Sequence, residues 1–196
     1  MDDDKIMRVE KNKIKMIKTI IKGMHRPIGI IPPFLRNMRI RRNRSHIISY
    51  DFLINDTYEY LIGGEDQMDW NKMYGWSFGM NHHKNSVRIV WRYNPKDKSV
   101  EFAPYAYMNG TMILPSNQQI VRGAIGDNIR TSIEVLGDTA HVVIYNGDIK
   151  HTTNFVFSGC EKKPLFGLWM YFGGNRTAPH DIKIQYVNGG TLSMHG

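Results

Sequence analysis

Cysteine is almost absent from this chain, and so are long apolar runs. Cys160 is the single cysteine among 196 residues, so no intrachain disulfide can form and a reducing compartment fits the sequence. No run approaches the ~18 consecutive apolar residues of a membrane-spanning helix. The first five residues, Met1–Lys5, are acidic where a secretory signal would be basic. We therefore expect no signal peptide, no membrane partner and a cytoplasmic location.

Helical periodicity is equally scarce. From residue 47 onward, short β-branched and aromatic runs alternate with turns of Gly, Asn and Asp. Gly137-Asp138, between two such runs, is typical of a two-residue hairpin turn. This spacing predicts an all-β fold, either an antiparallel sandwich or a barrel. The expected strands span residues 47–54, 58–62, 77–80, 86–93, 100–107, 129–136, 139–145, 154–158, 165–172 and 182–187.

Net positive charge is missing from most of the chain. Residues 1–49 hold 13 Lys and Arg against 4 Asp and Glu, and the rest holds the other 13 of 26 basic and 14 of 18 acidic residues. Residues 8–22 fit either an amphipathic helix or a strand, and the prolines and glycines of 23–33 indicate an extended connector. The predicted organisation is a tag-like remnant at 1–6, a basic extension at 7–46, a β-sandwich at 47–190 and a tail at 191–196.

The segment Leu168–Ile184 combines a strand, the glycine-rich turn Gly173-Gly174 and a last strand. In this pattern it resembles the closing strands of concanavalin-like jelly-roll proteins. Residues 75–93 resemble small hypothetical proteins of tailed phages and Bacteroidetes prophages. Together the two resemblances cover about residues 47–187 and imply an antiparallel jelly-roll β-sandwich. They leave the function open, because lectins, glycanases, lyases and virion proteins share that fold.

Carboxylates in the pattern of a glycoside hydrolase are scarce. Such an enzyme needs two of them across the scissile bond. Glu65, Asp66 and Asp69 form the nearest run, but they lack the alternation of a strand face and lie in an expected loop. A catalytic set of these acids with His82 is therefore an alternative to a solvated acidic loop.

Residue types suited to a polysaccharide lyase are present without a known lyase signature. A lyase must neutralise a uronate and abstract a proton. The suitable types are found at His82, His83, Arg88, Arg92, Tyr105 and Tyr107. The alternative interpretation places the two arginines on a solvent-facing strand side, which we favour, and the two tyrosines in edge packing.

A metal site has little support in the sequence. His82 and His83, if adjacent on a strand, would point to opposite faces, so only one could join His180 and Asp181. We expect no metal and no cofactor.

Two further surfaces are candidates for binding. Arg39, Arg41, Arg42 and Arg44 form the densest basic cluster, suited to assembly or to non-specific contact with a polyanion. Trp70 and Trp76 flank an expected loop and suit stacking on a sugar, whereas Trp91 and Trp169 are expected in the core. The full set of candidate ligand-binding residues is Trp70, Trp76, His82, His83, Arg88, Arg92, Tyr105, Tyr107, Asn175 and His180.

These observations favour a non-enzymatic, phage-type structural or surface protein. We expect it to assemble through its N-terminal extension, with itself or with other virion proteins, in the host cell and in the virion, and to have a surface suited to glycans. A carbohydrate-active enzyme on the same fold is the alternative interpretation, and a cytoplasmic binder of nucleotides or nucleic acid is the third.

Overall fold

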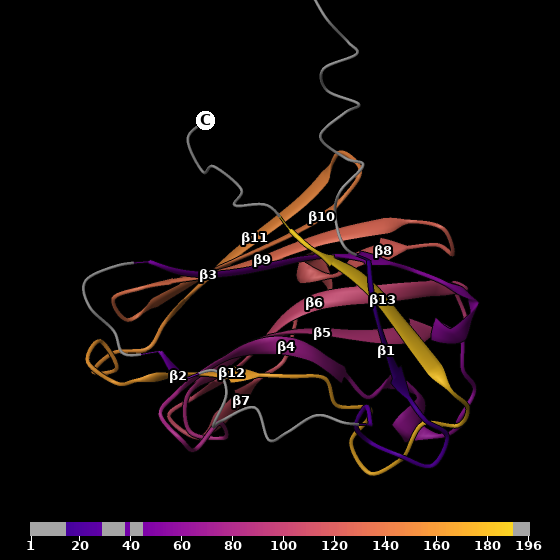
Figure 1. Cartoon of the computed structure of the whole chain (residues 1–196), viewed down its shortest axis with the longest axis horizontal. Coiled ribbons are helices and arrows are strands. Elements are labelled where there is room, and N and C mark those ends of the chain that lie inside the picture. Colours follow the sequence, from indigo (N-terminus) through magenta and orange to yellow (C-terminus); the bar gives the residue numbers. More distant parts are fainter. Residues whose placement is uncertain (1–14, 29–37, 40–44, 190–196) are drawn as a thin grey trace, which may run out of the picture.

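Two antiparallel sheets stacked face to face make up the protein in this computed structural model (Figure 1). The structure describes residues 15–28, 38–39 and 45–189. The back sheet contains, in spatial order, β1 (Met16–Ile20), β13 (Ile182–Asn188), β3 (His46–Leu53), β9 (Asn128–Leu136), β10 (Thr139–Asn146) and β11 (Ile149–Val156). The front sheet contains β2 (Met38–Arg39), β12 (Leu165–Leu168), β4 (Asn71–Phe78), β5 (Ser86–Asn94), β6 (Ser99–Met108) and β7 (Thr111–Ile113), with β8 (Val121–Gly123) also paired to β6.

The chain crosses between the sheets several times, as in a jelly roll. β1 pairs with β13, β3 with β9, and β12 with β4, so neighbours in space are distant in sequence. The prediction of an all-β antiparallel jelly-roll sandwich is confirmed. Within the described residues, helix is limited to the 3-10 turns η2 (Asp56–Tyr58), η3 (Glu65–Met68) and η4 (Asn117–Gln119), and none is long and apolar enough to cross a membrane.

The hairpin between β9 and β10 has the predicted turn. Leu136 pairs with Thr139, and Gly137 takes a φ of +59°, which a residue without a Cβ adopts at little cost. The predicted strand at 58–62 is wrong. Asn55 accepts a hydrogen bond from the Thr57 amide and starts η2, and the chain then runs as a loop.

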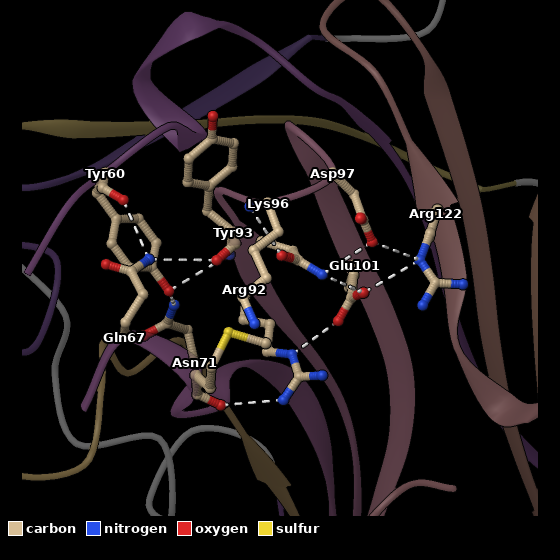
Figure 2. A network of polar contacts seen from close by, with 11 residues as sticks. Tyr60, Gln67, Asn71, Arg92, Tyr93, Lys96, Asp97, Glu101 and Arg122 are labelled. Carbon is tan, nitrogen blue, oxygen red and sulfur yellow. Dashed lines mark hydrogen bonds and ion pairs between the residues drawn. The ribbon is translucent and has the colours of Figure 1, made fainter. Parts of the chain in front are cut away.

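The side chain of Gln67 takes the place of a neighbouring strand along that loop. Its Oε1 accepts from the Ile62 amide at 2.8 Å, and its Nε2 donates to the Tyr60 carbonyl at 3.1 Å. Figure 2 shows Gln67 between Tyr60 and Tyr93. The alternating burial of this tyrosine-rich segment thus imitates a strand while its backbone is satisfied by an amide side chain.

Parts of the predicted N-terminal extension belong to the sheets. Residues 16–20 pair with β13 along their whole length, which resolves the choice between helix and strand for this part of 8–22. Residues 38–39 pair with β12 at the edge of the front sheet. Residues 1–14, 29–37, 40–44 and 190–196 lie outside the described residues, so the predicted remnant and tail are not tested.

The core fills the space between the sheets with large apolar side chains. Trp91, Phe52 and Phe102 are fully buried there, and Trp91 therefore lies where the sequence predicts it. Trp76 is only 4% exposed and also packs in this core, so the prediction that it serves as a surface platform for sugars is wrong. The reason is that β4 starts at Asn71, earlier than expected, and carries Trp76 in mid-strand.

Candidate functional site

A groove of about 730 Å³ lies on the outer face of the front sheet. Its floor follows from strand alternation: Val87 and Ile89 point into the core, so Arg88 between them points outward. Register places Arg88 opposite Gly75 on β4 and Tyr105 on β6. Two loops flank this floor, one at residues 80–83 after β4 and one at 169–174 after β12.

Arg88 lies across the floor with its stem over a glycine. A Cβ at Gly75 would meet the Val87 carbonyl oxygen at 2.0 Å and the Arg88 Cγ at 2.8 Å, so only glycine allows this packing. Burial, opposed by Tyr105 and Tyr107 and assisted by the charge of Arg26, lowers the pKa of Arg88 to about 10. Among the described residues, no hydrogen bond or ion pair reaches its guanidinium. The favoured prediction of a solvent-facing strand side for Arg88 is therefore wrong, because loops wall this face in.

Lys72 is a second cation on the floor. Its backbone pairs with Tyr171, donating at 2.7 Å and accepting at 2.9 Å. Its Nζ lies 5.8 Å from the centre of the Tyr105 ring and 3.5 Å from the Gly173 carbonyl oxygen. Burial and the charge of Arg88 lower the pKa of Lys72 to about 8, although Asp69 opposes that shift. The surroundings of Lys72 thus disfavour its charged form.

Two histidines form one end wall. His82 and His83 lie in a turn after β4, not on a strand, and their ring centres are 4.1 Å apart. The expectation that they point to opposite faces is wrong, because Asn81 accepts from the His83 amide and turns the chain so that both side chains line the groove. Burial, with the charges of Arg88, His83 and Arg26, lowers the pKa of His82 to about 4, so His82 is neutral at pH 7.

The opposite wall carries aromatic rings that the sequence did not single out as binding residues. The residues Trp169 and Tyr171 both line the groove, although the Trp169 ring packs against Tyr50 and Tyr186 of the back sheet. The guanidinium of Arg26 lies 5.6 Å from the centre of the Tyr171 ring, and His25 stacks on that ring at 4.8 Å. Trp169 lies beyond β12 and is half-buried, packing on Tyr50, so its predicted place in the core holds only in part.

The structure therefore assembles half of the predicted ligand-binding set. His82, His83, Arg88, Tyr105 and Tyr107 line one groove. Arg26, Lys72, Trp169 and Tyr171 were missed as ligand residues. Lys72 is close in sequence to the candidates Asp69 and Trp70. No sequence pattern, however, indicates that β4 and the 169–174 loop meet at Lys72.

Other predicted binding residues have structural partners elsewhere. The buried ring of Trp70 lies 4.1 Å from the guanidinium of Arg92, which is paired with Glu101, so neither lines the groove. His180 is hydrogen-bonded to the Thr57 carbonyl oxygen at 3.0 Å. Asn175 is exposed just past the groove-lining Gly174.

The predicted acidic catalytic set is not assembled in the groove. Glu65 and Asp66 lie on η3, and Asp66 accepts a hydrogen bond from Arg176 at 2.9 Å. Asp69 follows η3 and does not line the groove, and no other Asp or Glu in the described part of the chain does so. Across 15–28, 38–39 and 45–189, no group of three His, Cys, Asp or Glu side chains is close enough to hold a metal ion.

Most of the predicted arginine cluster falls outside the description. Arg39 pairs through its backbone with Leu165 at the edge of the front sheet. Arg41, Arg42 and Arg44 lie outside the described residues. Their suggested role in assembly or polyanion contact remains a prediction.

Comparison with known proteins yields distant likenesses only. No family model matches the chain, and no curated protein matches it. Among solved structures, it is similar to the alginate lyase from Klebsiella pneumoniae, with 12% identity and a TM-score of 0.39, over 75% of this chain and 60% of that one. It is also similar to chicken galectin 2 (10% identity, TM-score 0.31, 75% and 97%) and to the CBM2 module of the Lactobacillus casei BL23 phage J-1 evolved Dit (10%, 0.36, 91% and 71%). Likenesses this distant assign neither an activity nor a ligand to this chain.

Proposed function

We propose that this protein is a glycan-binding β-sandwich whose groove holds a short stretch of an oligosaccharide without cleaving it. The observation that carries the proposal is the lining of the groove. The aromatic residues Tyr105, Tyr107, Trp169 and Tyr171 line the same cavity as the donor-bearing residues Arg26, Lys72, Ser77 and Arg88.

This lining suits a sugar chemically. The C–H faces of a pyranose pack on aromatic rings, and its hydroxyl groups take hydrogen bonds from fixed donors. A volume of about 730 Å³ falls in the ordinary range for ligand pockets and accommodates a few sugar rings. The wall is formed by loops set on rigid strands, the usual arrangement of a binding site.

A glycan array followed by calorimetry tests this proposal. Tyr107→Ala removes a partly buried groove ring, and Tyr145→Ala removes a ring of similar exposure on β10 of the back sheet. We expect the intact protein to bind one glycan class, Tyr107→Ala to weaken binding about tenfold, and Tyr145→Ala to leave it unchanged. Absence of binding to any glycan, or equal losses in the two variants, would contradict the proposal.

Lyase activity is the second candidate, and one observation favours it. Five of the six residues named from the sequence for a lyase line the groove, and His82, neutral at pH 7, can accept a proton there. Incubation with polyuronates should then raise the ultraviolet absorbance of unsaturated products, and His82→Ala should abolish the rise. Binding without such a rise favours the non-enzymatic proposal.

Assembly through the N-terminal segment, as in a phage structural protein, is a separate proposal. Its support is that β1 lies at an outer edge of the back sheet, where an edge strand can pair with another chain. Light scattering should show oligomers of the intact protein, and a monomeric intact protein would contradict assembly.

A further inference from the structure

We infer that the groove is built for an acidic sugar, with Arg88, Lys72 and Arg26 forming a subsite for its carboxylate or sulfate group. This inference rests on the proposed glycan binding and narrows it to one chemical class. It predicts that the anionic group, more than the hydroxyl groups, determines affinity.

The charge of the groove carries the inference. Among the described residues, three that carry positive charge at pH 7 line it, Arg26, Lys72 and Arg88, and no Asp or Glu does. Among the described residues outside the groove, Asp69 is the one acidic residue whose charge acts on Lys72. Partly buried cations without a counter-ion are costly to a fold. Their cost is recovered when a ligand brings the negative charge.

Arg88 shows this most clearly. Its guanidinium has five N–H donors in a planar fork, the geometry that pairs with two oxygens of a carboxylate or sulfate. Within the described chain none of these donors is used by the protein. The stem is fixed over Gly75, so the fork is already oriented before a ligand arrives.

The pKa shifts around Arg88 share two causes, burial first and the charge of Arg88 second. Lys72 and His82 both have lowered pKa values, and for both the charge of Arg88 is the largest contribution after burial. Arg26 adds to the shift at His82 and at Arg88 itself. Each residue therefore senses an excess of positive potential, which an anion in the groove would relieve.

A single-stranded nucleic acid also combines flat rings with negative charges and could occupy such a groove. The arrangement of the cations favours an acidic sugar instead. Binding a nucleic-acid backbone takes a row of cations along the strand. Here the cations gather on one floor, with Lys72 and Arg88 on adjacent strands and Arg26 at the wall. A compact cluster beside stacking rings fits one charged group attached to a sugar.

The test compares matched ligands by calorimetry. The probes are an oligouronate, the same oligosaccharide with its carboxyl groups reduced to alcohols, a sulfated glycosaminoglycan oligosaccharide and a single-stranded oligonucleotide. Arg88→Met keeps the volume and removes the charge. Lys150→Met is the control, because it removes one exposed cation from β11 on the back sheet. Thermal unfolding checks each fold, and Lys72→Met replaces Arg88→Met if the latter does not fold.

We expect the intact protein to bind the uronate or the sulfated probe at least tenfold more tightly than the reduced one. Arg88→Met should lose at least tenfold in affinity for the acidic probe only, and Lys150→Met should keep the affinity of the intact protein. The acidic probe that binds more tightly shows whether the subsite prefers a carboxylate or a sulfate. If the reduced oligosaccharide binds as tightly as the acidic probes, the inference fails while glycan binding stands. If no oligosaccharide binds, both fail. Tighter binding of the oligonucleotide than of every oligosaccharide would also overturn the inference.

Discussion

Arg88 and Arg92 lie on the same strand and on the same face of the front sheet, yet their surroundings differ completely. Arg92 donates from Nε to Glu101 at 2.7 Å and from Nη1 to the Met68 carbonyl at 3.1 Å, and its guanidinium covers the Trp70 ring. Arg88, two pleat repeats away, has neither a hydrogen bond nor an ion pair among the described residues. The guanidinium of Arg92 is thus hydrogen-bonded within the protein, whereas that of Arg88 is available to a ligand.

The cluster around Glu101 is an example of buried charges that are paired and hydrogen-bonded within this fold. Glu101 is fully buried, and its two oxygens accept from Arg92, Arg122 and Asn94 at 2.7–3.2 Å (Figure 2). Asp97 lies 3.8 Å from Arg122 and adds a second negative charge. Two cations thus face two anions, so this cluster is close to neutral, whereas the described lining of the groove has three cations and no anion. We infer that the neutral cluster stabilises the fold and that the unbalanced one binds a ligand.

Glu101→Ala should have the largest effect on stability. It would leave Arg92 and Arg122 without their buried acceptor, a change that typically costs about 3–5 kcal/mol. Urea unfolding monitored by tryptophan fluorescence measures the loss. A loss below 1 kcal/mol would show that water replaces Glu101 easily, and the two arginines would then differ less than proposed.

Methionine at each arginine in turn compares the two sites directly. Arg92→Met should destabilise the fold by about 1–3 kcal/mol, because Glu101 loses a charged partner. Arg88→Met should cost nothing or stabilise the fold by about 1 kcal/mol, since it removes an uncompensated cation. The same urea titration measures both changes. Equal losses would indicate that Arg88 is a structural residue like Arg92.

The pH dependence of binding sharpens the contrast further. Lys72, with a pKa of about 8, faces Arg88 from β5, the Tyr105 ring from β6 and Asp69 from the preceding loop. It is charged below that pH and neutral above it, and a bound anion favours the charged form. Affinity for an acidic oligosaccharide should therefore fall several-fold as pH rises from about 7 to 9.5. Lys72→Met should flatten this decline in calorimetry, and a decline that persists in the variant would assign it to another group.

The smallest effect is expected at the surface pair of Arg176 and Asp66. Their side chains are 63% and 26% exposed, so solvent screens the 2.9 Å contact. Arg176→Met should change the free energy of unfolding by less than about 1 kcal/mol. A larger change would mean that charge pairing near the groove is generally structural, and would weaken the contrast between Arg88 and Arg92.

Strand alternation made most of the sandwich predictable, and it failed where alternation breaks. The register of β4 shifts between Lys72 and Tyr74, which puts Met73 and Tyr74 both in the core. This bulge hides the start of the strand and so the burial of Trp76. The pattern at 58–62 failed for a different reason, because Gln67 satisfies a backbone that no strand pairs with.

The candidate site was predictable only in its residue types. The alternation of β5 and β6 put Arg88, Tyr105 and Tyr107 on one face, and the structure keeps them together. What makes that face a groove is the meeting of β12 with β4, about ninety residues apart in sequence, which brings Tyr171 to Lys72. No local pattern encodes such a pairing, so Arg26, Lys72 and Tyr171 were missed.

A crystal structure of the protein with an oligouronate or a sulfated oligosaccharide tests the central claim most directly. The quantity to measure is the distance from the ligand's anionic oxygens to the Arg88 guanidinium nitrogens. The account predicts a two-oxygen contact within hydrogen-bond distance, with sugar rings against the aromatic wall. A bound oligosaccharide lying away from the groove, or lying in it with only hydroxyl groups near Arg88, would contradict the account.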